Sequence, residues 1–391
     1  MNSKGLLTGA FVLVWFAALT EGLSWALFLH FPGYLQDLGA SEVQIGVVVG
    51  VASLTSIAAR PWVGQASDTR GRRPLILLGN AINVLALFLY LTVSSIGPWL
   101  YVVRIIHGIG IGILFPVLFT YAADVVPEDR RTQGLALFGV SGLLPIALGG
   151  VIGDLVLGLW DFQALFMTAL SFAIIALLLS LSLRETVKMG ESSAVPRRGF
   201  FRALGDRRLL PLWFIIGVFA LVLTSYFIFL KTFIGETGIG SVGLFFAVYA
   251  VTAILLRVSL GWLPDRVGPR RVLYPSFGAL ALGFLVLAGT GSALHIALAG
   301  MLSGIGHGFG FPILLTMVVD RATDAERGSA VALFTTEIDL GLLIGGPVLG
   351  AVIDVWGYSA MFAACAFVIV AAIPVFSMWD RAAIDRAVQE V

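Results

Sequence analysis

Twelve long apolar runs divide the chain and restrict its fold more than any other feature. Each is about 20 residues long or longer, which is the length that an α-helix needs to cross the hydrocarbon core of a bilayer. The runs are continuous and do not alternate between apolar and polar residues, which excludes a membrane β-barrel. The sequence therefore predicts an all-α membrane protein with twelve transmembrane helices, at residues 5–31, 42–66, 73–95, 98–123, 131–156, 160–183, 209–233, 240–263, 271–290, 293–319, 328–354 and 357–379.

The composition also indicates that the chain lies in a lipid bilayer. Charged residues make up 12% of the 391 residues and hydrophobic residues 59%, whereas soluble domains carry about 25% charged residues. The net charge of +1 gives no signal for nucleic-acid binding. The single cysteine, Cys365, excludes an internal disulfide and a cysteine-based metal site, and the four histidines lack ligand spacing. We therefore expect no metal and no cofactor.

Lysine and arginine residues predict the orientation in the membrane. All but four of the 24 lie in the termini or in the loops that follow even-numbered helices. The exceptions are Arg60, Arg104 and Arg257, which lie within helices, and Lys231, which lies near the end of the seventh helix. Because positive charge accumulates on the cytoplasmic side, we expect both termini in the cytoplasm. The first apolar run has no convincing signal-peptidase site, so we interpret it as a retained helix.

One hydrophilic segment divides the helices six and six. Residues 185–207 contain serines, a proline and a basic cluster, and they are too few to form a domain. We interpret them as a cytoplasmic linker. The predicted organisation is an N-terminal six-helix bundle at residues 1–184, this linker, and a C-terminal six-helix bundle at residues 208–391.

The two halves are repeats of each other. Residues 108–166 align with residues 304–362 at constant spacing, matching Phe115-Pro116 with Phe311-Pro312 and Trp160 with Trp356. Six helices per copy give both copies the same orientation. This predicts a parallel repeat related by an axis along the membrane normal, with a binding site near the midplane between the halves.

A short basic, glycine-containing loop recurs in both halves. The first signature loop (residues 64–73) and the second signature loop (residues 261–271) follow the second helix of their halves. They resemble the G-x-x-x-D-(R/K)-x-G-R-(R/K) loop of the major facilitator superfamily of secondary transporters, with Thr69 and Pro269 as departures. The matching residues are Gly64, Asp68, Gly71, Arg72 and Arg73 in the first loop, and Gly261, Asp265, Arg266, Gly268 and Arg270 in the second. The resemblance spans the whole chain and implies that family's two-bundle fold and alternating access.

The chemistry of the first signature loop predicts a cytoplasmic gate. Gly64 would allow close helix approach and Gly71 a tight turn. Asp68 can accept hydrogen bonds at a helix start and pair with arginine between the halves. Asp124 and Asp320, which close the fourth and tenth helices, are further partners for arginine. The alternative is that these arginines only fix topology.

Two further patterns bear on the kind of transport. Arg104, followed by the glycines of the fourth helix, resembles the family's R-x-x-x-G-x-G pattern, in which the arginine is thought to assist proton transfer in exporters. His107 lies one turn from it on nearly the same face. The fifth helix carries an imperfect version of the exporter signature, because Pro145 is displaced relative to Gly149-Gly150. This departure weakens the resemblance to exporters.

Ionisable residues within the membrane are candidate site residues, because their burial costs several kcal/mol, of the order of 3 kcal/mol each on insertion scales. Glu21 lies in the first helix with Trp25 and Phe28 on its face, which resembles the proton and cation site of multidrug antiporters. The alternative is a structural hydrogen bond. Glu337 and Asp339 lie near mid-depth in the eleventh helix and point about 200° apart, so we expect only one of them to face a cavity.

Two more residues complete the predicted substrate and proton pathway. His307 lies near mid-depth in the tenth helix, where a lone histidine is more often a satisfied helix contact than a proton carrier. Tyr226 in the seventh helix could line a cavity, although aromatic residues in membrane helices usually pack or anchor.

Together these features favour a proton-coupled exporter of small amphipathic or aromatic molecules, with the proton gradient in place of a cofactor. A proton symporter of a sugar or small organic acid, or a lipid or glycolipid flippase, remains open. An enzyme is disfavoured because the chain has no HExxH or GxSxG motif, and a receptor because it has no sizeable domain outside the membrane. We expect a monomer in a bacterial-type cytoplasmic membrane, whose partners are a small-molecule substrate and the lipid bilayer.

Overall fold

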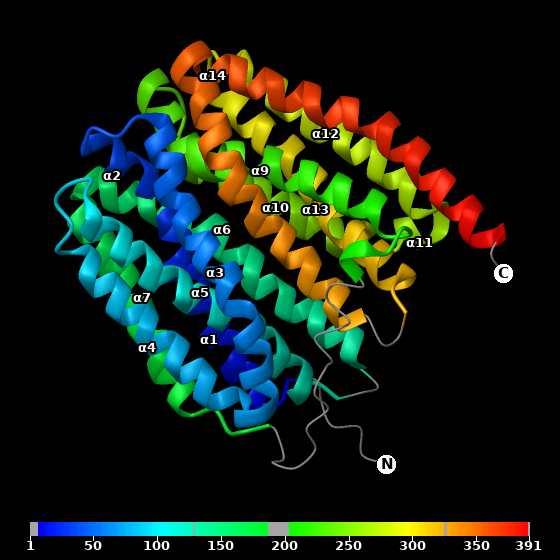
Figure 1. Ribbon diagram of the computed structural model, residues 1–391. Coiled ribbons are helices and arrows are strands. Elements are labelled where there is room, and N and C mark those ends of the chain that lie inside the picture. The colour runs from blue at the N-terminus through cyan, green and yellow to red at the C-terminus, as the bar shows by residue number, and fades with distance from the viewer. Residues whose placement is uncertain (1–6, 128–129, 187–202, 324–326, 390–391) are drawn as a thin grey trace. The chain divides into compact units, whose positions relative to one another are not determined.

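A computed structural model describes residues 7–127, 130–186, 203–323 and 327–389, and these form two compact units. Unit 1 comprises Met1–Ala40 and Val51–Ala194, and unit 2 comprises Ser41–Gly50 and Val195–Val391. The described residues are helices joined by short connections and include no strand, as Figure 1 shows. The all-α prediction is confirmed.

The helices of unit 1 correspond to the first six predicted runs. The first run is α1, which continues through a 3₁₀ segment, η1, into α2. The elements are α1 (Gly9–Ala26), η1 (Leu27–His30), α2 (Phe31–Asp37), α3 (Glu42–Arg70), α4 (Arg72–Tyr90), α5 (Pro98–Val125), α6 (Arg131–Leu159) and α7 (Phe162–Leu181). The first residues of α3 belong to unit 2 and the rest to unit 1.

Unit 2 contains the remaining elements. They are α9 (Leu210–Thr237), α10 (Val242–Leu260), the short α11 (Leu263–Val267), α12 (Pro269–Ala288), α13 (Ala293–Arg321) and α14 (Arg327–Gln389). The backbone of α14 leaves the helical region at Gly357, with φ 80° and ψ 173°, and the helix folds back there (orange to red in Figure 1). Within the described residues eleven stretches are long and apolar enough to cross a bilayer, and the last of these, Gly328–Ala383, covers the last two predicted runs.

Local chemistry explains several helix ends. The side chain of Asp161 accepts from the backbone N–H of Ala164 at 2.9 Å and begins α7, and Ser241 caps α10 in the same way. Pro98 begins α5, at a position where its missing N–H costs nothing. At the other end of α9, Gly238 takes the left-handed conformation, with φ 66°, that commonly ends a helix.

The packing within each unit repeats. In unit 1, α4 packs against α5 and α7, and α1 packs against α6 and α7. In unit 2, α12 packs in the same way against α13 and α14, and α9 packs against α14. Corresponding helices therefore have corresponding neighbours, as the sequence repeat requires.

Small residues bring α1 and α6 into close contact. A Cβ on Gly22 would stand 2.7 Å from the ring of Pro145, and one on Gly149 would stand 2.4 Å from the Cβ of Ala26. The contact positions advance by four residues on both helices, which keeps one face of each together along parallel axes. Close packing of this kind stabilises membrane helices through van der Waals contact. Pro145 and Gly149 of the imperfect exporter signature thus contact α1.

Candidate functional site

The first signature loop is almost entirely helical. The prediction of a ten-residue loop was wrong, because α3 continues to Arg70 and α4 begins at Arg72. Gly71 alone makes the turn, with φ 97° and ψ 165°, a region essentially restricted to glycine. The carboxylate of Glu185 accepts from the backbone N–H groups of Arg72 and Arg73 at 2.9 and 3.0 Å. A carboxylate at a helix N-terminus satisfies free donors and complements the helix dipole.

The side chains of Arg72 and Arg73 in this loop have separate partners within unit 1. Arg72 donates from Nε to Asp124 Oδ2 at 3.3 Å, so the predicted pairing of Asp124 with an arginine is present. Arg73 donates to the carbonyls of Leu183 at 2.7 Å and Leu181 at 3.1 Å, at the end of α7. The loop therefore joins α4 to the ends of α5 and α7.

In the second signature loop, Gly268 makes the corresponding turn, with φ 96°, but the charges are arranged differently. Asp380, which is fully buried, lies 2.6 Å from Arg270 Nη2 and 2.6 Å from Arg321 Nη1. Arg321 also donates to the backbone carbonyl of Arg208 at 3.1 Å. A buried carboxylate between two arginines thus ties α12, α13 and α14 together.

Asp380 was missed by the sequence analysis, which paired arginine with Asp320 instead. Asp320 is exposed, and in the described part of the chain it has no hydrogen bond or ion pair. Asp265 and Arg266 are also exposed, and the guanidinium of Arg266 lies 5.0 Å from the ring centre of Trp262. The only sequence signal for Asp380 is a lone carboxylate at the end of an apolar run.

Two further expectations for the first signature loop are not confirmed. A Cβ at Gly64 would meet no atom of the described residues within 4 Å, so within this part of the chain the predicted close approach is absent. The side chain of Asp68 lies outside the described residues, and its proposed contact remains a prediction.

The turn into α9 is held by a local ion pair. The Asp206 carboxylate accepts from the Arg208 side chain at 2.8 and 3.2 Å and from the Arg208 backbone N–H at 2.9 Å. Burial alone would raise the pKa of Asp206, but these hydrogen bonds and the positive charge of Arg208 outweigh it and lower the pKa from its usual range. Asp206 is therefore the charged partner of Arg208 at neutral pH.

Arg104 and His107 meet at one tyrosine in the interior of unit 1. Arg104 Nη1 donates to the Tyr90 hydroxyl at 3.2 Å, and the same hydroxyl lies 3.3 Å from His107 Nδ1. All three residues are buried. The Arg104 guanidinium also lies 5.1 Å from the ring centre of Phe31, a cation–π distance. The structure thus confirms that Arg104 and His107 share a face, and it adds Tyr90, Phe28 and Phe31 to their surroundings.

His307 has aromatic and hydroxyl neighbours in unit 2. Its Nδ1 contacts the hydroxyl of Tyr249, and its ring stacks on that of Tyr249 with centres 5.6 Å apart. Tyr226 is 1% exposed and packs against Tyr249 and Phe245. Within the described residues, both His307 and Tyr226 therefore pack against other aromatic side chains.

Glu21 and Glu337 differ from His307 and Tyr226 in their burial and in their partners. Both are half-buried, and neither forms a hydrogen bond or ion pair with the residues that the structure describes. Glu337 Oε2 lies 3.3 Å from where a Cβ on Gly217 of α9 would stand. Trp25, one turn after Glu21, and Asp339, two residues after Glu337, are also half-buried.

Unit 2 also contains a cluster of two carboxylates, Glu42 and Asp354, that the sequence did not reveal. Glu42 at the start of α3 accepts from Tyr358 at 2.6 Å and from Thr232 at 3.2 Å. Asp354 accepts from the backbone N–H groups of Glu42 and Val43 at 3.0 and 3.2 Å. These contacts join residues about 190 to 316 positions apart, which no local pattern can predict.

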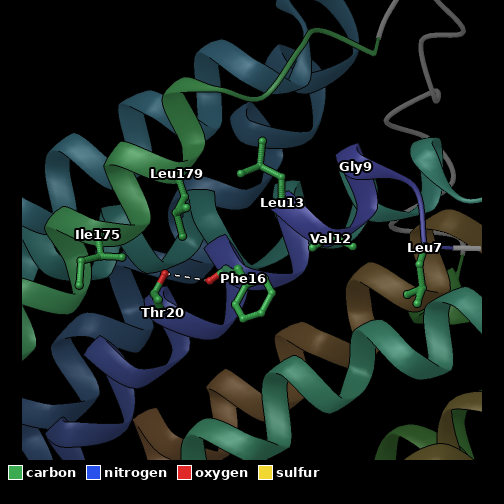
Figure 2. Close-up of a pocket in the computed structure, with 8 residues that line it drawn as sticks. All are labelled: Leu7, Gly9, Val12, Leu13, Phe16, Thr20, Ile175 and Leu179. Carbon is green, nitrogen blue, oxygen red and sulfur yellow. Dashed lines mark hydrogen bonds between the residues drawn. The ribbon is translucent and has the colours of Figure 1, made fainter.

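An apolar cavity of about 590 Å³ lies between α1 and α7. Figure 2 shows the side chains that border it, including the hydrogen bond from Thr20 Oγ1 to the carbonyl of Phe16 at 2.9 Å. It contains none of the ionisable residues singled out above. Its lining residues are Leu7, Gly9, Val12, Leu13, Phe16, Thr20, Ile175 and Leu179.

Known proteins resemble the chain over nearly its full length. The staphylopine export protein of Staphylococcus aureus is 22% identical over 352 residues, covering 85% of this chain and 86% of that protein. The multidrug resistance protein MdtG of Serratia proteamaculans is 24% identical over 385 residues, covering 94% and 92%. Among solved structures, a mutant of the nucleoside transporter NupG matches with a TM-score of 0.79 at 14% identity, over 95% of this chain and 100% of that one. That likeness shows the shared fold.

The family assignment follows from a direct match. The model of the Major Facilitator Superfamily matches residues 11–241 and again residues 212–388, and the two overlapping matches together cover both halves of the chain. The helices, the two signature loops and these matches agree. The chain is a multi-pass membrane protein that belongs to the Major Facilitator Superfamily.

Proposed function

We propose that this secondary transporter is a proton-coupled exporter of small amphipathic or aromatic compounds and works by alternating access. The observation that carries the proposal is the pair of half-buried carboxylates, Glu21 and Glu337, that lack a partner among the described residues. A structural carboxylate in a membrane helix is normally paired. A carboxylate that exchanges a proton for substrate must instead be able to change its charge.

The relatives support the direction of transport. The names of the staphylopine export protein and of the multidrug resistance proteins MdtG and MdtL describe export or drug resistance. Glu21 or Glu337 would bind a proton on the outer side of the membrane and release it on the cytoplasmic side. This inward movement of protons would drive substrate outward. The proposed setting is a cytoplasmic membrane with both termini inside, as the charge distribution predicts.

The test uses purified protein in proteoliposomes with ethidium as an aromatic cation probe. We expect an imposed pH gradient to drive ethidium against its concentration gradient, and a protonophore to abolish this movement. Glu21→Gln or Glu337→Gln should lower gradient-driven transport at least tenfold. Glu236→Gln, which alters an exposed glutamate of α9, is the matched control and should transport normally.

The same vesicles separate the alternatives. Movement of probe together with protons would indicate a symporter, and transbilayer movement of a fluorescent lipid would indicate a flippase. Gradient-driven ethidium export that is unaffected by both glutamine variants would refute the role of these carboxylates. Absence of any gradient-driven movement across a panel of aromatic cations would refute the proposed function.

A further inference from the structure

The first membrane-crossing segment changes its helical type in the middle of unit 1. Between α1 and α2, residues Leu27–His30 form the 3₁₀ segment η1. A 3₁₀ stretch inside a longer helix often marks a functional position, and its three residues per turn align positions i and i+3. Leu27 and His30 therefore share one face, while Phe28 and Phe31 share another.

The first face is fixed by a hydrogen bond of the buried His30 side chain. His30 is fully buried, and its Nε2 lies 3.0 Å from Oδ1 of Asp154 on α6. The ring lies against Gly153, where a Cβ would stand 2.3 Å from His30 Cε1. Only glycine at position 153 leaves room for this ring. The imidazole is thus held by both a hydrogen bond and a fitted surface.

The second face borders the cluster of Arg104 and His107. The ring centre of Phe28 lies 4.7 Å from that of His107 and 4.9 Å from that of Tyr90. The Arg104 guanidinium lies 5.1 Å from the ring centre of Phe31. A rotation of η1 about its axis would move both phenylalanine rings and change the surroundings of the arginine and the histidine together.

We propose that His30 and Asp154 are positioning residues, which hold η1 in the rotation that places Phe28 and Phe31 against His107 and Arg104. Their effect on transport rests on the proposed function, because it requires that the Arg104 cluster belong to the transport pathway. Their effect on the geometry of η1 does not depend on the proposed function. A misplacement of about 1 Å at a functional group can cost about a hundredfold in rate, so a fixed rotation of η1 has a functional consequence.

The direct test observes the histidines themselves. The chain has four histidines, so protein labelled only in histidine gives an NMR spectrum whose signals can be assigned by single substitutions. Asp154→Ala removes the acceptor for His30. We expect it to shift the signals of His30 and His107 and to leave those of His295 and His307 unchanged, because Phe28 links only His107 to η1. Asp154→Asn keeps an acceptor at the same place and should restore the parental His107 signal.

The control is another aspartate of unit 1. Asp124→Ala removes an acceptor of the Arg72 side chain, a contact that involves no residue of η1, and it should leave His30 and His107 unshifted. If Asp154→Ala does not fold, Asp154→Ser serves, since its shorter side chain cannot reach His30. A shift of His30 with no shift of His107 overturns the proposal, as does the same His107 shift in Asp124→Ala.

A transport measurement separates this inference from the proposed function. For ethidium, Asp154→Ala should lower the maximal transport rate by at least about tenfold, and Asp154→Asn should recover most of that rate. An unchanged maximal rate in a protein whose His107 signal has shifted would overturn the link to transport. If the parent protein moves no aromatic cation at all, the proposed function fails, while the NMR result still decides whether the pair positions the cluster.

Discussion

At the scale of single residues, Gly71 and Gly64 of the first signature loop differ in what surrounds them. Gly71 was expected to make a tight turn, and its φ of 97° confirms this. The sequence could not show that the turn is closed by Glu185, because the hydrogen bonds span 112 and 113 residues. Gly64 matches the family pattern equally well, yet a Cβ at this position would meet no atom of the described residues within 4 Å. A motif match alone therefore does not say which of its glycines is required sterically.

This difference gives opposite predictions for two similar substitutions. Gly71→Ala should destabilise the protein by about 1–3 kcal/mol, because the backbone conformation is restricted to glycine and the new Cβ would lie 2.4 Å from the Glu185 carboxylate. Gly64→Ala should be neutral or stabilise by up to about 1 kcal/mol, because alanine is favoured inside a helix. Thermal unfolding in detergent compares them. Equal midpoints for the two variants would contradict the steric role of Gly71.

A second residue-scale prediction concerns the carboxylate that the sequence analysis missed. Asp380→Asn should lower stability by about 1–3 kcal/mol, because Arg270 and Arg321 lose their charged acceptor. The side chain of Arg270 is 38% exposed, so solvent partly screens its charge and limits this loss of stability. Asp320→Asn is the matched control and should have no effect, since Asp320 is exposed and forms no ion pair within the described residues. Unfolding midpoints in the reverse order would restore Asp320 as the structural partner.

At the scale of helices, hydrophobic length located the elements well and their packing faces poorly. The predicted run at residues 98–123 is α5 (Pro98–Val125), and that at 209–233 is α9 (Leu210–Thr237). The polar end of α3 was assigned to a loop because hydropathy falls before the helix ends. The close contact of α1 with α6 was not predicted, because glycine spacing shows that a helix can be approached but not by which neighbour.

That contact predicts a position-specific effect along α6. Gly149→Ala should destabilise by about 1–3 kcal/mol, because overpacking forces the helices apart where the new Cβ would lie 2.4 Å from Ala26. Gly142→Ala, on the same helix, meets no atom within 4 Å and should change stability by less than about 0.5 kcal/mol. Thermal unfolding of both variants tests the register, and a large loss from Gly142→Ala would show that α6 packs on another face.

At the scale of the whole molecule, the internal repeat was the most informative part of the sequence. It predicted equivalent neighbours for equivalent helices, and the packing within the two units agrees. Repetition could not predict the asymmetric features, such as the contact between His30 and Asp154 in unit 1. Those contacts depend on side chains that have no counterpart in the other copy.

The orientation of the molecule can be tested with its only cysteine removed. In a Cys365→Ala background, Ser182→Cys after α7 should react with a membrane-impermeant maleimide only from the cytoplasmic side. Ser95→Cys, in the connection between α4 and α5, should react only from the opposite side. Both positions are exposed, so access to the reagent is limited by the membrane alone. Labelling of Ser95→Cys from the cytoplasm would reverse the predicted topology.

The two ways of closing a signature loop have a consequence for chimeric transporters. In unit 1 the carboxylate of Glu185 binds backbone N–H groups of α4. In unit 2 the first of those positions is Pro269, which has no N–H, and at the repeat spacing Arg381 occupies the place of Glu185. The carboxylate one residue earlier, Asp380, binds the Arg270 side chain instead. A signature loop and the end of the sixth helix of its half must therefore be exchanged together. A graft that moves only the second loop into unit 1 would place Pro269 opposite the Glu185 carboxylate, to which a proline cannot donate a hydrogen bond.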